Sequence, residues 1–129
     1  ISGNAGVFGT AEDVARVLDM FIHEGTYKGH RIIDQKIFRQ FITTHGKGNR
    51  RCLGFDKGRA SMAESASGST YGHTGFTGTC VWVDPENELI FVFLSNRTYP
   101  NRLNKTLMTA SIRPRLHQAI YEALGIAEQ

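Results

Sequence analysis

Residues 71–97 read YGHTGFTGTCVWVDPENELIFVFLSNR, and this stretch decides the fold. Between residues 78 and 83, alternate positions point to opposite faces of an extended chain. Cys80 and Trp82 would lie on one face, with Thr79, Val81 and Val83 on the other. Both faces therefore carry apolar groups, as expected for a strand that is covered on both sides.

The residues after this strand predict a tight turn and a return strand. Asp84-Pro85-Glu86-Asn87 has Asp first and Pro second, as a type I turn prefers. The run LIFVFL at 89–94 is apolar at every position, which is typical of a strand buried on both faces. We therefore expect an antiparallel hairpin with a helix or another domain on each side, central in its sheet and not a solvent-facing edge ribbon.

Two helices are expected upstream of the hairpin. Thr10 is a good N-cap, the first turn that follows is acidic, and Gly25 supplies a stop, which predicts a helix over about residues 11–24. Asp34 is placed to cap a second helix. Their apolar faces recur at helical spacing: Val14, Val17, Leu18, Phe21 and Ile22 in the first, and Ile37, Phe38, Phe41 and Ile42 in the second.

The remaining segments are less regular. Residues 27–33 are turn-like, the sequence RCLGFD at 51–56 favours a short strand, and residues 57–70 resemble a mobile loop with little to bury. After a linker without a pattern, Ser111 is a plausible cap for a last helix that carries Pro114 in its first turn. The apolar stripe expected on this helix is Ile112, Leu116, Ala119, Ile120, Ala123 and Leu124.

The length of the chain and the order of its expected elements limit the possible architectures. With 129 residues, 40% of them hydrophobic, the chain supports one α+β unit, an antiparallel sheet flanked by helices. Residues 1–48 are its mainly helical part, and residues 49–129 hold the hairpin and the C-terminal helix. The sequence starts with ISGNAGVFGT, without a methionine or a signal-like segment, so we expect a piece of a longer protein.

Charge, cysteine and histidine content exclude several functions. The formal charge is +3, and the region between residues 97 and 115 has five basic residues and no acid. No nucleic-acid motif accompanies these basic residues. We therefore interpret the region as a solvated face and expect no nucleic-acid partner. Cys52 and Cys80 match no metal motif; free buried thiols are favoured over a disulfide. The five histidines show no His-x-x-x-His spacing, and His23 and His117 fit surface or helix-end roles, so we expect no metal and no cofactor.

The polar cluster at the start of the hairpin is the candidate site. His73-Thr74-Gly75 is followed by further hydroxyls and glycines beside a buried strand. Glycine lets a ligand approach the backbone, hydroxyls donate to an anion, and amides at a strand edge can hold an oxyanion. Alone, this three-residue pattern also fits a strand that simply begins with a turn.

Together with GNAGVFGTAEDVARVL at 3–18 and CLGFD at 52–56, this stretch resembles the C-terminal part of the beta-lactamase-related serine hydrolases. That group contains class C beta-lactamases, penicillin-binding DD-peptidases and related esterases, and the resemblance extends from residue 3 to about 124. It implies a catalytic role for His73, which would tune the electrostatics of the site, and for the backbone amide of Phe76 as one of two oxyanion-hole donors. It implies substrate binding by Thr74, through a hydrogen bond to a carboxylate or an equivalent group, and by Gly75, which would leave room beside the strand.

The family builds its site from two further motifs, Ser-x-x-Lys and Tyr-x-Asn. No serine in the 129 residues is followed three positions later by lysine, and Tyr99-Pro100-Asn101 comes after the hairpin instead of before it. We therefore expect the chain to be inactive alone and to need the missing N-terminal half of the same protein to hydrolyse an amide or ester, such as a beta-lactam or a peptidoglycan peptide. The alternative is a non-catalytic binding or interaction module that kept the fold.

Two expectations concern assembly and location. The family's sheet includes strands from the N-terminal half, so here one strand should have an unpaired edge, which predicts a homo-oligomer of the fragment. The expected ligand is a small molecule or a peptide. The sequence gives no location, and the resemblance implies a periplasmic or membrane-anchored protein.

Overall fold

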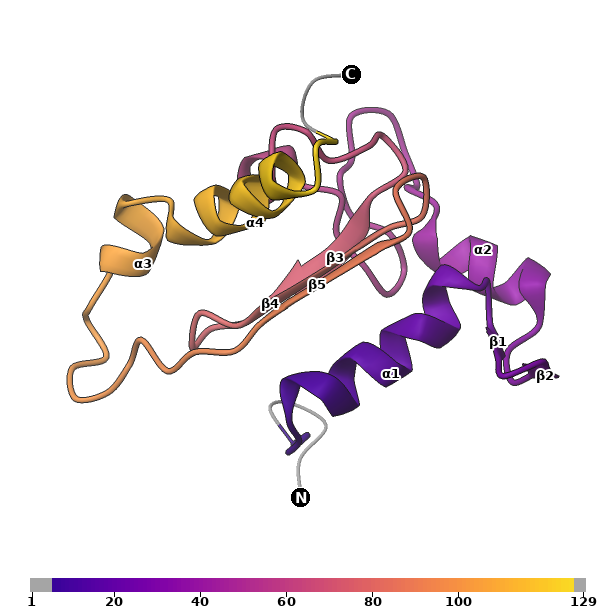
Figure 1. Ribbon diagram of the computed structural model, residues 1–129, viewed down its shortest axis with the longest axis horizontal. Coiled ribbons are helices and arrows are strands. Elements are labelled where there is room, and N and C mark those ends of the chain that lie inside the picture. The colour runs from indigo at the N-terminus through magenta and orange to yellow at the C-terminus, as the bar shows by residue number, and fades with distance from the viewer. Residues whose placement is uncertain (1–5, 127–129) are drawn as a thin grey trace.

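The computed structural model describes residues 6–126, so the first five residues of ISGNAGVFGT lie outside the described residues. Its elements follow the chain from α1 to α4 (Figure 1). They are α1 (Ala11–Ile22), β1 (Thr26–Tyr27), β2 (His30–Arg31), α2 (Gln35–Ile42), the 3-10 helix η1 (Arg59–Ser61), β3 (Tyr71–Thr74), β4 (Cys80–Asp84), β5 (Leu89–Phe93), α3 (Thr106–Thr109) and α4 (Ile112–Ala123).

The sheet that organises the fold has three antiparallel strands in the order β3-β4-β5. In the hairpin, Val81 pairs with Val92 and Trp82 with Phe91, which confirms the predicted pair of strands and their turn. Only β4 is central, however. Among residues 6–126 no strand pairs with the outer side of β5, so the prediction of a hairpin with two central strands is wrong for β5.

Helices cover both faces of this sheet, with α1 on one side and α4 on the other (Figure 1). Side chains that alternate along β4 and β5 enter two separate cores. The core under α1 is built on Leu18, Phe38, Tyr71 and Val83, and the core under α4 on Met62, Ala63, Ala66, Cys80, Trp82, Phe91 and Tyr121. The protein is α+β, as the sequence predicts.

Helix α1 begins with a capping box. The Asp13 amide donates to Thr10 Oγ1 at 3.2 Å, and the Thr10 amide donates to Asp13 Oδ2 at 3.0 Å, which satisfies two otherwise free donors. The chain turns away at Gly25, where φ is +91° and a Cβ would lie 2.5 Å from the Ile33 carbonyl oxygen. Only glycine fits there.

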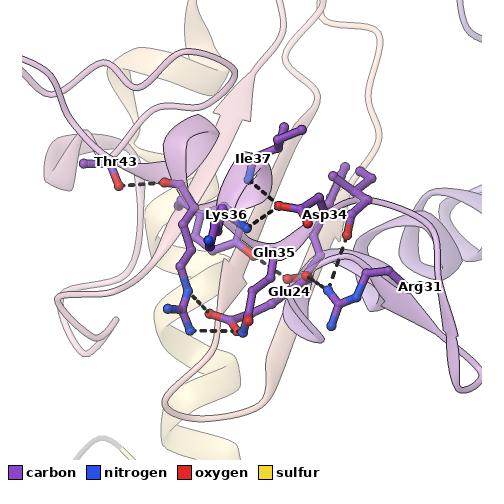
Figure 2. Close-up of polar contacts among 11 residues, drawn as sticks. Glu24, Arg31, Asp34, Gln35, Lys36, Ile37 and Thr43 are labelled. Atoms are coloured by element: carbon purple, nitrogen blue, oxygen red, sulfur yellow. Dashed lines mark hydrogen bonds and ion pairs between the residues drawn. The ribbon is translucent and has the colours of Figure 1, made fainter.

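A polar network ties α2 to the end of α1 (Figure 2). The Glu24 carboxylate accepts from Arg39 Nε at 3.0 Å and from Gln35, and its carbonyl accepts from Arg31 Nη1 at 2.7 Å. Asp34 caps α2 by accepting from the Lys36 amide at 2.9 Å, as predicted. The segment expected to be turn-like contains the small hairpin β1–β2.

Two predictions between α2 and β3 are wrong. Residues 51–56 form no regular strand, because the backbone folds back on itself and the Cys52 amide donates to the Phe55 carbonyl, leaving isolated bridges such as Asp56↔Gly72. The segment 57–70 is not empty of core residues, since Met62, Ala63 and Ala66 are buried. Arg59 stabilises the conformation of this segment by donating hydrogen bonds to the carbonyls of Glu64, Ala66 and Ser67.

Helix α4 packs on the sheet through a different face from the predicted stripe. Leu116 and Leu124 are 43% and 57% exposed, whereas His117 and Tyr121 are fully buried, so the surface role expected for His117 is wrong. His117 Nδ1 accepts from the Ala63 amide at 3.0 Å, and its ring stacks on Phe91. The contacts of His117 with Ala63 and Phe91 thus determine which face of α4 packs on the sheet. Ser111 precedes α4, but its side chain makes no capping hydrogen bond.

The two cysteines are unpaired, as the sequence favours, but only Cys80 is buried and Cys52 is partly exposed. Burial raises the pKa of the Cys80 thiol to about 11. Within the part of the chain that the structure describes, no helix has the length and hydrophobicity to cross a membrane. No cluster of three or more His, Cys, Asp or Glu side chains gathers there in a way that would hold a metal ion.

Candidate active site

The candidate site lies at the end of β3, where the outer edge of the strand becomes free. Gly72 uses both backbone groups on that side: its carbonyl accepts from the Asp56 amide at 2.7 Å and its amide donates to the Asp56 carbonyl at 3.0 Å. Backbone groups alternate between the two sides of a strand, so Thr74 directs its amide and carbonyl to the same edge. Beyond Asp56 nothing in residues 6–126 pairs with this edge.

The two polar side chains of the motif project to opposite faces of the sheet. His73 lies across from Val81, which packs in the core under α1, whereas Thr74 lies across from Cys80 in the core under α4. A single ligand would reach both only at the strand edge that they share. His73 is exposed and Thr74 is half-buried.

The contacts of His73 define its protonation. Its Nδ1 lies 2.8 Å from the Thr74 carbonyl oxygen, which only accepts, so Nδ1 must carry the proton. Its Nε2 lies 2.9 Å from Nη1 of Arg51, which only donates, so Nε2 must offer its lone pair. The imidazole is therefore neutral, with the proton on Nδ1.

Behind Arg51 lies a buried carboxylate. Asp56 is 3% exposed, and its Oδ2 is 3.4 Å from Arg51 Nη1 and in direct contact with Arg50. The Gly58 amide donates to its other oxygen at 2.8 Å. Two guanidinium groups facing one carboxylate leave a net positive charge beside His73.

The turn after β3 presents the amide of Phe76. The Gly75 carbonyl accepts from the Gly78 amide at 3.0 Å, which fixes the plane of the peptide bond between Gly75 and Phe76. In a trans peptide the amide points opposite to the carbonyl, so the Phe76 N–H is directed out of the turn. Among residues 6–126 this amide donates to no other group. It is thus a fixed and available donor.

Arg97 holds the other side of this turn. Its Nε donates to the Phe76 carbonyl at 2.8 Å, its guanidinium lies 4.7 Å from the centre of the Phe76 ring, and its amide donates to the Thr77 carbonyl at 2.9 Å. Arg113 reaches the Gly78 carbonyl at 3.4 Å. The basic region at 97–115 is therefore not simply a solvated face, because two of its arginines stabilise the turn.

Gly75 has a structural reason to be glycine besides the role that the resemblance implies. A Cβ at this position would lie 2.3 Å from Thr79 Oγ1. Next to the motif, a hollow of about 270 Å³ opens on the α1 side of the sheet. Its lining combines His73 with Val14, Thr79, Val81 and Leu94, among others. A small, mostly apolar group would fit beside the imidazole.

Sequence reasoning identified the four consecutive residues at 73–76 but not the side chains that hold them. Arg51, Asp56 and Arg97 were missed, since a strand was expected at 51–56 and a solvated face at 97–115. The signal that was available is the pairing of two arginines with an aspartate in RRCLGFD. In the assembled site, the Phe76 amide can donate one hydrogen bond to a developing oxyanion, next to the neutral imidazole of His73 and the positive charge of Arg51.

Comparisons with known proteins identify the family of the chain. A family model described as Beta-lactamase matches residues 2–111. A protein named "Putative D-alanyl-D-alanine carboxypeptidase" from Salmonella agona (strain SL483) is 36% identical over 104 residues, which are 77% of this chain and 24% of the relative; proteins of the same name from Salmonella newport (strain SL254) and Salmonella dublin match to the same extent. The chain thus spans about a quarter of the length of these curated relatives. It belongs to the beta-lactamase family.

Proposed function

We propose that this chain is the C-terminal segment of a hydrolase that cleaves an amide or ester bond through an acyl-serine intermediate. The observation that carries the proposal is the Phe76 amide, which is fixed in direction, free of a partner among the described residues and placed at the open end of β3. The names of the curated relatives favour a peptide ending in D-alanyl-D-alanine as the substrate, with a beta-lactam as a related amide.

In this proposal each residue of the motif has one role. The Phe76 amide is one of two donors to the tetrahedral oxyanion, and the other is the amide of a serine that lies outside this chain. The Thr74 hydroxyl binds the carboxylate of the substrate or an equivalent polar group. His73 acts on the electrostatics of the site and not as a base, because its Nε2 lone pair is already engaged by Arg51.

The second candidate is a binding module that kept the fold, since the free edge of β3 can bind a ligand without a nucleophile. Such a module would bind peptidoglycan fragments or a protein along the free edge of β3. The two candidates differ in the parent sequence, since an enzyme requires Ser-x-x-Lys upstream of this segment and a binding module does not.

The test is hydrolysis by the full-length protein and by this chain alone. We expect the full-length protein to turn over nitrocefin, a p-nitrophenyl ester or a peptide ending in D-Ala-D-Ala, with a loss of activity in Thr74→Val and His73→Ala, and no turnover by the isolated chain. His30→Gln, at an exposed position in β2, serves as the matched control. Turnover by the isolated chain that survives His73→Ala would contradict the proposal.

A further inference from the structure

We propose that Arg51 is a positioning residue for His73, which it holds as the neutral Nδ1–H tautomer while its own guanidinium supplies the permanent positive charge beside the strand edge. The proposal rests on the function proposed above, in which this edge binds an anionic or developing-anionic group. It assigns the charge of the site to a residue 22 positions upstream of the motif.

The geometry around His73 leaves one arrangement of protons. The Thr74 carbonyl oxygen can only accept, so Nδ1 of His73 must be the donor in that contact. Arg51 Nη1 can only donate, so Nε2 of His73 must be the acceptor. A proton on Nε2 would face the guanidinium directly and break the 2.9 Å contact. Arg51 therefore favours the tautomer that His73 shows, as hydrogen bonds to one ring nitrogen generally decide which nitrogen is protonated.

The charges behind His73 explain why Arg51 is available for this contact. Arg50 and Arg51 both approach Asp56, but Arg50 makes the direct contact, while Arg51 Nη1 is 3.4 Å from the carboxylate. Asp56 is buried and is itself held by the Gly58 amide. One carboxylate balances one guanidinium, so the second remains as a net charge that lies against His73.

This arrangement gives the His73-Thr74-Gly75 motif a permanent positive charge that the imidazole itself does not carry. A lysine at the first position would carry its own positive charge, whereas His73 in the tautomer seen here carries none. Arginine stays charged over the whole physiological pH range. The Arg51–His73 pair thus places a charge near the edge of β3 that does not depend on protonation of the imidazole.

The first experiment reads the tautomer directly on this chain and does not require activity. Long-range ¹H–¹⁵N NMR spectra in alkaline buffer, with the His73 signals assigned by comparison with His73→Gln, should show Nδ1 protonated in the unmodified chain. Arg51→Met should move the signals toward the Nε2–H form, and Arg51→Lys, which keeps a donor and a charge, should restore part of the Nδ1–H pattern. The matched control is Arg50→Met, which removes a contact with the same carboxylate but none with His73.

The second experiment uses the full-length protein with the same variants. We expect Arg51→Met to lower kcat/KM on the order of tenfold to a hundredfold, the size of loss that misplacement of a catalytic group produces, and Arg51→Lys to recover part of it. His73 signals that stay unchanged in Arg51→Met, or that move equally in Arg50→Met, would overturn the proposal. If the tautomer responds as expected but the full-length protein hydrolyses none of the substrates, the proposed function fails and the positioning of His73 by Arg51 stands.

Discussion

At the scale of single residues, two ionisable side chains are buried between the sheet and α4. Burial opposes ionisation of Asp84, but hydrogen bonds from Ser67, Tyr121 and Asn87 outweigh it and lower the pKa of Asp84 to about 2. Burial lowers the pKa of His117 to about 4, against the opposing effect of the Asp84 charge. Both groups couple the stability of this core to pH.

The histidine allows a specific prediction. Because the folded protein binds a proton at His117 less readily than the unfolded chain, this residue costs no stability above its ordinary pKa of 6.5, and the free energy of unfolding falls as the pH drops from there to about 4. This lowering of the His117 pKa corresponds to a loss of about 3 kcal/mol in the free energy of unfolding once the pH is below about 4. His117→Gln should remove this acid-sensitive step, as measured by urea unfolding followed through Trp82 fluorescence at about pH 7 and about pH 4.5.

The exposed His30 gives the control for that experiment. His30→Gln should lose the same stability on acidification as the unmodified chain. If His117→Gln also loses the same stability, the titration of His117 does not govern the step. Protonation of Asp84 is expected separately, as the pH falls from its ordinary pKa of 3.8 to about 2.

A second prediction concerns why position 75 is glycine. In Gly75→Ala the new Cβ would collide with Thr79 Oγ1, so the free energy of unfolding should fall by about 1–3 kcal/mol. Removing that hydroxyl in Gly75→Ala/Thr79→Ala should restore most of the loss, as measured by chemical unfolding. A double variant that remains as unstable as Gly75→Ala would exclude the collision as the cause. One that is stable but inactive in the full-length protein would support the role implied by the resemblance, room for substrate.

At the scale of elements, the close approach of β3 to β4 also depends on a glycine. A Cβ at Gly72 would lie 1.9 Å from the Val81 carbonyl oxygen and 2.5 Å from the Trp82 ring. Gly72→Ala should therefore destabilise the protein by more than about 3 kcal/mol or prevent folding. Gly68→Ala is the matched control, because no atom lies within 4 Å of its added Cβ, and its effect should stay within about 0.5 kcal/mol. Thermal unfolding of the two variants checks this, and equal effects would contradict it.

Elements whose signals are local were predicted well from the sequence. The capping residues Thr10 and Asp34 and the apolar runs of β4 and β5 act within a few positions, so α1, α2 and the hairpin were correctly expected. The face of α4 was not, because burial of His117 and Tyr121 depends on Ala63 and Asp84, which are distant in sequence.

The same limit applies to the candidate site. Residues 73–76 are contiguous and carry a readable pattern, and the structure confirms where they lie without testing their roles. The contact between Arg51 and His73 spans 22 positions and exists only because the chain doubles back at Cys52 and Phe55. No periodicity or spacing in the sequence encodes such a reversal.

At the scale of the whole molecule, the outer edge of β5 is open among residues 6–126. Since Gly72 bonds outward to Asp56, the alternation of backbone groups across the sheet places the amides of Ile90 and Val92 on that open edge and the amide of Phe91 inside the sheet. Unpaired edges recruit further strands. We therefore propose that the isolated chain self-associates through β5.

Light scattering and hydrogen exchange test this proposal together. The isolated chain should form a dimer or larger oligomer as its concentration rises, and the Ile90 and Val92 amides should become protected over the same range. The Phe91 amide should be protected at all concentrations. A monomer at high concentration would contradict self-association, and an oligomer in which Ile90 and Val92 stay unprotected would place the interface elsewhere.

We propose that the pairing of Asp56 with Gly72 also limits the length of a peptide ligand that binds this edge. An extended peptide that added itself to the outer side of β3 would find hydrogen-bonding groups at Thr74, but it would meet the chain around Asp56 as soon as it continued toward Gly72. The open edge therefore ends abruptly in that direction. Such an edge selects ligands by length, accepting a peptide that terminates beside Thr74 and excluding one that runs on past it.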